Sequence, residues 1–228
     1  MPVERQAIEK IVREYLLANP EVLEEAKAEL ERRQEQARLG AQTAALEQNA
    51  NELTRSANDF VVGNPNGDVT LVEFFDFNCG YCKKAVEDIR ELVSSDPKLR
   101  IVLKDFPILS EGSAEAAKVA LAAKSQLPAD KQFDFHVKLL ETQGMIDGTR
   151  ALEVAGEMGL DLAKIKAGMS GEEVKTTLAA NVKLAQTLGL TGTPSFVIGK
   201  EVVQGAVGFE SLKASVDNAR RCIKELTC

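Results

Sequence analysis

The stretch LVEFFDFNCGYC, residues 71–82, decides the fold. Residues 69–75 form a continuous run rich in β-branched and aromatic side chains, which predicts a buried strand. Residues 83–93, KKAVEDIRELV, have the apolar spacing of an amphipathic helix. We therefore expect Cys79 and Cys82 to lie where a strand gives way to a helix.

That position gives the Cys79 thiol a specific chemistry. The free N–H groups and the dipole of the first helical turn favour negative charge, so the pKa of the thiol should fall. Cys82 follows three residues later on the same side, at a spacing that permits a disulfide. Cys79 could then attack a substrate disulfide and Cys82 could resolve the mixed disulfide. This chemistry requires an exposed Cys79, whereas Cys82 need not be exposed.

A metal site is the alternative use of two close cysteines. Structural zinc needs four ligands, but Cys222 and Cys228 have a different spacing and the single histidine, His136, lies within a helical pattern. We expect His136 to be a structural or solvated helix residue. Monovalent copper needs only two thiolates, so copper(I) on Cys79 and Cys82 remains open.

The rest of the chain predicts an α/β domain with an all-helical insertion. Residues 100–106, 194–199 and 201–207 have strand patterns, and a last helix begins near Phe209. Helical periodicity occupies most of residues 113–188. The expected catalytic domain therefore comprises residues 63–112 and 189–228, interrupted by the insertion at 113–188.

Residues 1–62 have a different composition, rich in Glu, Ala, Arg and Gln. Ile8, Ile11, Val12, Tyr15 and Leu16 form an apolar stripe, and Leu39, Leu46, Leu53 and Phe60 recur every seven residues. A narrow apolar seam on a long charged helix needs a partner to bury it. We predict a helical oligomerisation arm and linker over 1–62; an arm folded back on its own domain is the alternative. The turn-forming residues 63–68 mark the expected boundary.

Composition limits the partners and the compartment. The net charge of −7 argues against nucleic acid and anionic membranes as partners. No apolar run is long enough to insert into a membrane. The N-terminus lacks a signal-peptide pattern, so we expect any signal peptide to be absent from this chain. Four cysteines permit full pairing, which suits an oxidising compartment.

LVEFFDFNCGYC and the distant TGTPSFVIG, residues 191–199, resemble the thioredoxin superfamily of the DsbA-like type. The resemblance covers residues 60–225. It implies a cis-proline at Thr193-Pro194, facing the cysteines and binding extended substrate with Gly80 and Tyr81. It also implies that Glu73 lies buried under the site and takes a proton from Cys82. An exposed strand position for Glu73, and a plain surface role for Tyr81, are the alternatives.

Finer likenesses suggest the type of activity. The dipeptide Gly80-Tyr81 and Thr193 resemble the disulfide isomerase DsbC, and the absence of a histidine between the cysteines favours a less oxidising centre. A DsbA-like domain behind a helical arm resembles the suppressor-of-copper-sensitivity protein C group. That resemblance implies a periplasmic, homotrimeric disulfide isomerase or reductase, with a link to copper, acting on misfolded disulfide-containing proteins. A membrane thiol reductase of the DsbD or suppressor-of-copper-sensitivity B type would keep it reduced. A DsbA-like dithiol oxidase and a copper(I)-binding protein are the rival functions.

Cys222 and Cys228 form a second local pair. A continuous helix would hold their α-carbons too far apart, so a disulfide requires the helix to end between them. We expect a structural disulfide that contributes about 2.4 kcal/mol through its short loop. A terminal thiol pair that binds metal or couples to other chains is the alternative.

Overall fold

The computed structural model describes residues 2–225, which form two compact units that divide after Ala44. The first unit contains helix α1 (Pro2–Ala18) and most of helix α2 (Glu21–Gln48). The second unit contains the remaining helices and all the described strands. In residues 2–225, no helix is both long and apolar enough to cross a membrane.

The first unit presents apolar side chains to solvent. Ile11 is 64% exposed and Leu39 is 46% exposed, although both belong to the apolar pattern of their helices. Ion pairs one turn apart, such as Glu29 with Arg32 at 2.7 Å, lie along α2. The unit therefore leaves uncovered the side chains that the sequence pattern assigns to a buried seam.

A five-stranded sheet organises the second unit, in the order β1-β3-β2-β4-β5. Strand β2 (Val69–Phe75) runs parallel to β3 (Leu99–Asp105) and antiparallel to β4 (Ser195–Ile198). The edges are β1 (Phe60–Gly63) and β5 (Glu201–Gln204), both antiparallel to their neighbours. Strand β2 is central and buried on both faces, which explains its nearly unbroken apolar sequence.

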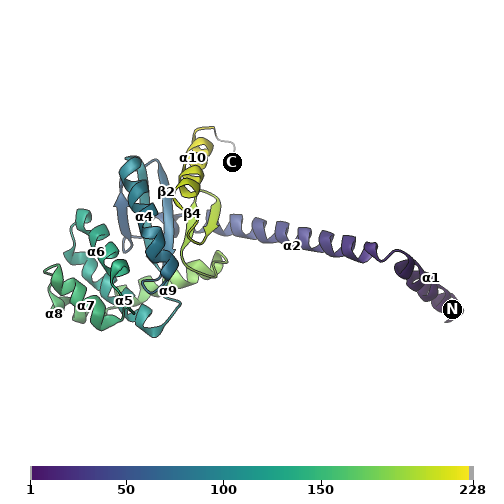
Figure 1. The fold of residues 1–228 in the computed structure, drawn as a ribbon, viewed down its shortest axis with the longest axis horizontal. Coiled ribbons are helices and arrows are strands. Elements are labelled where there is room, and N and C mark those ends of the chain that lie inside the picture. The colour runs from purple at the N-terminus through teal and green to yellow at the C-terminus, as the bar shows by residue number, and fades with distance from the viewer. Residues whose placement is uncertain (1, 226–228) are drawn as a thin grey trace. The chain divides into compact units, whose positions relative to one another are not determined.

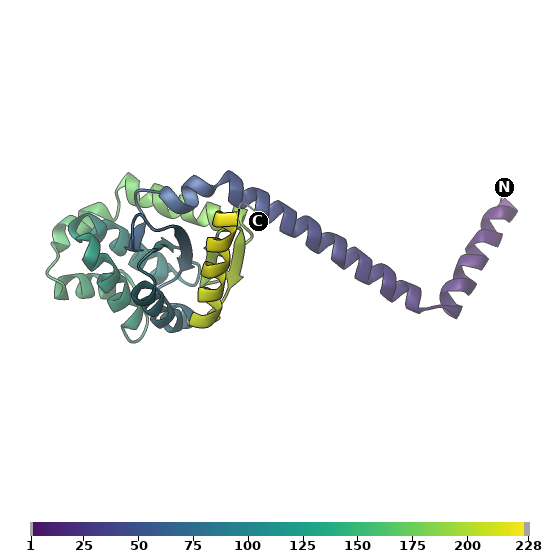
Figure 2. The same cartoon turned by 90° about the horizontal axis from the view of Figure 1, so that it is seen from above.

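Two hydrophobic cores cover the two faces of this sheet. Leu71 and Phe75 belong to the core shared with α4 (Gly80–Ser95) and α10 (Phe209–Glu225). Val72 and Phe74 belong to the core shared with α3 (Ala50–Arg55) and α9 (Glu172–Thr187), as the alternation of side chains along a strand requires. Figure 2 shows α10 (yellow) and α9 (light green) on different sides of the strands.

The insertion between β3 and β4 is helical, as the periodicity predicts. It contains α5 (Glu111–Ala123), the 3-10 turn η1 (Lys124–Gln126), α6 (Ala129–Glu141), α7 (Gly148–Glu157), α8 (Leu162–Gly168) and α9. Helices α5 to α8 gather beyond one edge of the sheet, next to α4 (Figure 1). The predicted fold class, a thioredoxin-type α/β domain with a helical insertion and N-terminal helices, is confirmed.

The boundary of the arm differs from the expectation. Leu46 and Leu53 are each only 3% exposed and belong to the core under the sheet, so they do not form a seam for another chain. Phe60 lies in β1, a strand that the sequence analysis did not predict. The turn at 63–68 joins two strands of one sheet: a Cβ on Gly67 would lie 2.5 Å from the Lys98 carbonyl oxygen. The heptad spacing of these side chains reflects burial in their own unit.

Candidate active site

Cys79 caps the N-terminus of α4. Its Sγ accepts a hydrogen bond from the backbone N–H of Cys82 at 3.4 Å. The pKa of the Cys79 thiol is lowered to about 5, first by a hydrogen bond from the Cys82 thiol and further by the backbone N–H groups of Cys82 and Tyr81, against the opposing effect of burial. The first helical turn therefore favours the thiolate, as the sequence predicts.

Cys82 lies one turn inside α4 and is fully buried. Burial raises the pKa of its thiol far above the ordinary value, and the hydrogen bond to Cys79 and the charge of Glu73 add to the shift. Both cysteines are free thiols in this structure. The pair is thus unequal: one sulfur ionises readily, and the other holds its proton.

The exposure of Cys79 differs from the sequence expectation. Only 6% of the residue is exposed. Its thiol donates a hydrogen bond to the Thr193 carbonyl oxygen at 3.1 Å, so the sulfur lies between the first turn of α4 and the backbone that precedes β4. An incoming disulfide must therefore approach Cys79 through a narrow opening, or displace this contact.

Residues 193 and 194 form the wall opposite α4. The Thr193-Pro194 peptide bond is cis, and the Pro194 carbonyl accepts a hydrogen bond from Gly205 N–H at 2.8 Å. Gly80 and Tyr81 lie on the outer side of the dithiol; Tyr81 is 63% exposed, with Lys84 Nζ 5.4 Å from its ring centre. Roles for these four residues in substrate binding remain predictions.

Glu73 lies on β2, on the sheet face that it shares with Leu71 and Phe75. It is 1% exposed, which contradicts the alternative of an exposed strand residue. Burial, followed by the charges of Cys79 and Asp88, raises the pKa of its carboxyl to about 8. The carboxyl is therefore mostly protonated at neutral pH and can exchange a proton in the range where thiols react.

Two polar residues before the nucleophile were missed by the sequence analysis. The Asn78 side chain accepts from Ile146 N–H at 2.7 Å and donates to the Ile146 carbonyl at 2.8 Å and to Ser113 Oγ at 3.0 Å. The buried Asp76 carboxylate accepts from three backbone N–H groups, those of Asn78, Ile108 and Leu109. These bonds attach the dithiol loop to the helical insertion. The sequence did carry a signal for these contacts, because Asp76 and Asn78 are polar residues inside an apolar run.

His136 is a structural residue. It is 3% exposed and its ring lies 4.5 Å from the ring of Phe75 and 5.8 Å from that of Phe77, measured between ring centres. Burial lowers the pKa of the imidazole to about 3, so the ring stays neutral. His136 therefore supports the strand and the loop that lead to Cys79.

The described part of the chain contains no group of three or more His, Cys, Asp or Glu side chains suited to hold a metal ion. Cys222 lies in α10. Cys228 lies outside the described residues, so its pairing with Cys222 remains a prediction.

The central sheet, the helical insertion and the two unequal cysteines at the start of α4 define the class of this protein: a thioredoxin-fold protein with a dithiol site. The chain belongs to the DSBA-like thioredoxin domain family, which matches residues 70–217. Residues 4–37 match a second family, the copper resistance protein ScsC N-terminal domain.

Solved structures support the same assignment. A thioredoxin-like oxidoreductase from Silicibacter pomeroyi is 43% identical, with a TM-score of 0.71 over 75% of this chain and 97% of that one. A linker-deletion mutant of ScsC from Proteus mirabilis is 26% identical, with a TM-score of 0.73 over 96% of both chains. A periplasmic thioredoxin-like protein from Salmonella enterica is 26% identical, with a TM-score of 0.66 over 75% of this chain and 95% of that one.

Some curated relatives are much longer proteins. The Na(+)/H(+) antiporter NhaA 1 of Salinispora arenicola is 29% identical over 161 residues, which are 71% of this chain and 24% of the antiporter. This chain therefore spans about a quarter of the length of the first curated relatives that it matches.

Proposed function

We propose that this protein is a thiol–disulfide oxidoreductase that acts mainly as a protein disulfide isomerase and reductase. The observation that carries the proposal is the unequal thiol pair: Cys79, with a pKa near 5, beside Cys82, which is buried and keeps its proton. A thiolate at neutral pH is the nucleophile that disulfide exchange requires.

The reaction proceeds in two exchanges. The Cys79 thiolate attacks one sulfur of a client disulfide, that S–S bond breaks, and the departing client sulfur takes up a proton. The Cys82 thiol then loses its proton and attacks Cys79, which releases the second client sulfur and forms the Cys79–Cys82 disulfide. In isomerisation, a client thiol attacks the mixed disulfide in place of Cys82, so no net oxidation occurs.

Glu73 would accept the proton of Cys82. The charge of the Cys79 thiolate helps to raise the pKa of the Glu73 carboxyl. Once Cys79 is bonded to the client, that charge is gone and the pKa of Glu73 falls. Glu73 thus ionises more readily at the step at which Cys82 must lose its proton, although its burial still holds the pKa above the ordinary value.

The pKa of Cys79 favours an intermediate redox poise. A value near 5 lies between those of thioredoxin-type reductants, about 7, and of the strongest dithiol oxidants, about 3.5. Such a centre can serve as an isomerase if it is kept reduced. We assign that task to a membrane thiol reductase of the DsbD or suppressor-of-copper-sensitivity B type, with misfolded disulfide-containing proteins as clients.

The exposed apolar side chains of α1 and α2 support assembly into a homo-oligomer, which we propose to be a trimer. Linked dithiol sites would raise the effective concentration of nucleophile on one client. The similarity to the periplasmic thioredoxin-like protein of Salmonella enterica supports a periplasmic location for this chain.

A second function, copper(I) binding by Cys79 and Cys82, is favoured by the match of residues 4–37 to a copper resistance protein domain. Two thiolates suit a soft monovalent ion. Cys82 would have to lose its proton to act as a ligand. Titration of copper(I) against a chelator, with Cys79→Ser and Cys82→Ser as controls, tests this function.

Refolding of scrambled ribonuclease tests the main proposal. The reduced protein should restore ribonuclease activity, and Cys79→Ser should abolish that rescue. Deletion of residues 1–44 should leave a folded monomer that rescues poorly but oxidises reduced client faster. Fast oxidation by the full-length protein without rescue of scrambled client would instead identify a DsbA-like oxidase. An oligomeric truncated chain in light scattering would refute the role of the arm.

A further inference from the structure

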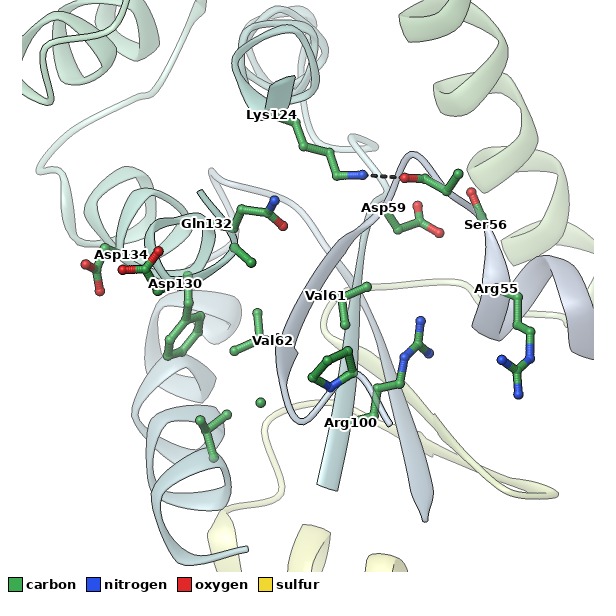
Figure 3. A pocket seen from close by; sticks show the side chains of 16 residues that line it. Arg55, Ser56, Asp59, Val61, Val62, Arg100, Lys124, Asp130, Gln132 and Asp134 are labelled. Carbon is green, nitrogen blue, oxygen red and sulfur yellow. Dashed lines mark hydrogen bonds between the residues drawn. The ribbon is translucent and has the colours of Figure 1, made fainter. Parts of the chain in front are cut away.

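A cavity of about 830 Å³ lies beside the edge strand β1 (Figure 3). Its wall includes Arg55 at the end of α3, Arg100 on β3 and Lys124 in η1, with Val61 and Asp59 between them. It shares none of these lining residues with the dithiol site. The proposed exchange reaction gives this cavity no role.

The basic end of the cavity carries uncompensated positive charge. In the described part of the chain, neither Arg55 nor Arg100 forms an ion pair within 4.0 Å. The nearby Asp59 carboxylate is already bound to the buried Lys104 Nζ at 2.5 Å. Figure 3 shows Arg55 and Arg100 in the same part of the cavity, below Asp59 in this view, with Lys124 above Asp59. A half-buried arginine that faces a second arginine is destabilised unless an anion joins it.

The electrostatics of Arg100 are consistent with this picture. Burial, and then the charge of Arg55, lower the pKa of its guanidinium, and Asp59 opposes them only in part. Lys124 differs from the arginines: burial lowers the pKa of its amine, but the charges of Asp59 and Glu173 oppose that shift, and the amine donates a hydrogen bond to the Ala57 carbonyl.

The acidic side chains of the wall lie apart from this end. Asp130 and Asp134 belong to the first turns of α6, and Figure 3 shows them at the far side of the cavity from Arg55. Asp134 is bound to Lys131 at 3.0 Å. The charges are therefore segregated, and the carboxylates leave Arg55 and Arg100 without a protein partner.

We propose that Arg55 and Arg100 form a binding site for a tetrahedral oxyanion of the phosphate or sulfate class, free or as an ester. Guanidinium groups bind such anions with paired hydrogen bonds. Two adjacent guanidinium groups suit a doubly charged anion better than a single carboxylate or chloride.

Thermal unfolding and calorimetric titration of the full-length protein test the site. Inorganic phosphate and sulfate should bind saturably and raise the unfolding temperature above that in chloride at equal ionic strength. Arg55→Gln and Arg100→Gln should each weaken phosphate binding roughly tenfold or more. Arg90→Gln removes the same charge from an arginine that is paired with Glu141 elsewhere on the surface, and should leave phosphate binding unchanged.

Because Arg55 is exposed at a helix end, Arg55→Gln should fold normally even if Arg100→Gln does not. Neither variant should change the reactivity of Cys79, which separates this proposal from the function of the dithiol. Stronger binding of glycerol phosphate than of inorganic phosphate would assign the site to a phosphate ester, and the reverse to the free anion. Equal effects of phosphate, acetate and chloride, or unchanged phosphate binding in Arg55→Gln, would overturn the proposal.

Discussion

The hydrogen bond from the Cys82 thiol is the largest single cause of the low pKa of Cys79, which makes it the most informative contact to remove. Replacing Cys82 by alanine deletes this donor but keeps the backbone N–H at 3.4 Å and the helix N-terminus. A hydrogen bond to a charged group contributes about 1.5–3 kcal/mol, which corresponds to roughly one to two pKa units. The Cys79 pKa should therefore rise from about 5 to about 6–7 in Cys82→Ala.

Cys82→Ser is the matched control, because its hydroxyl can still donate to the thiolate. Its Cys79 pKa should stay within about half a unit of the value in the reduced wild-type protein. Thiolate absorbance near ~240 nm and the rate of alkylation, both followed from about pH 3 to pH 9, measure the titration over the range in which a perturbed thiol ionises. Equal pKa values in the alanine and serine variants would refute the role of the Cys82 donor. A wild-type thiol that titrates near the ordinary 9.0 would refute the whole electrostatic account of the site.

Three further predictions test other contacts. Glu73→Gln should change the pH dependence of unfolding. In the wild type, the raised pKa of Glu73 favours the folded state at low pH, and up to about 5 kcal/mol of the free energy of unfolding is lost as the pH rises from 4.5 to about 8. Urea unfolding at both ends of this range should show that loss in the wild type but not in the variant. Asn78→Ala should speed hydrogen exchange at Ile146 N–H and alter the redox potential of the dithiol, whereas Ser113→Ala, which removes only one of the three Asn78 side-chain bonds, should have a smaller effect. Leu53→Ala should destabilise the protein by about 2–5 kcal/mol. A change below about 0.5 kcal/mol, the usual range for surface positions, would contradict the burial of Leu53 and favour an exposed seam.

Local patterns predicted the parts of the fold that depend on neighbours in the sequence. The strand and helix around Cys79 and the helices of the insertion follow from periodicity over short segments. The lowered pKa of Cys79 was also predicted, although its largest cause is the Cys82 thiol and the backbone N–H groups at the helix end contribute less. These features depend on the backbone of one or two adjacent elements, which the sequence specifies directly.

Contacts between distant segments could not be predicted from these local patterns. The heptad spacing of Leu46 and Leu53 is compatible with a partner helix or with their own sheet, and periodicity alone does not distinguish the two. The bonds of Asn78 to Ile146 and of Asp59 to Lys104 join residues 68 and 45 positions apart. The low exposure of Cys79 results from the Thr193 carbonyl, which lies 114 residues away.

The short segment before β1 has a mechanical consequence. The Ala57 carbonyl accepts a hydrogen bond from Lys124, Asn58 donates one to Thr177 at 3.0 Å, and Asp59 forms an ion pair with Lys104. Three successive residues are thus bonded to η1, α9 and β3, one to each. Force transmitted along the chain before Ala57 should therefore be borne by these three bonds before it reaches the sheet that carries the dithiol.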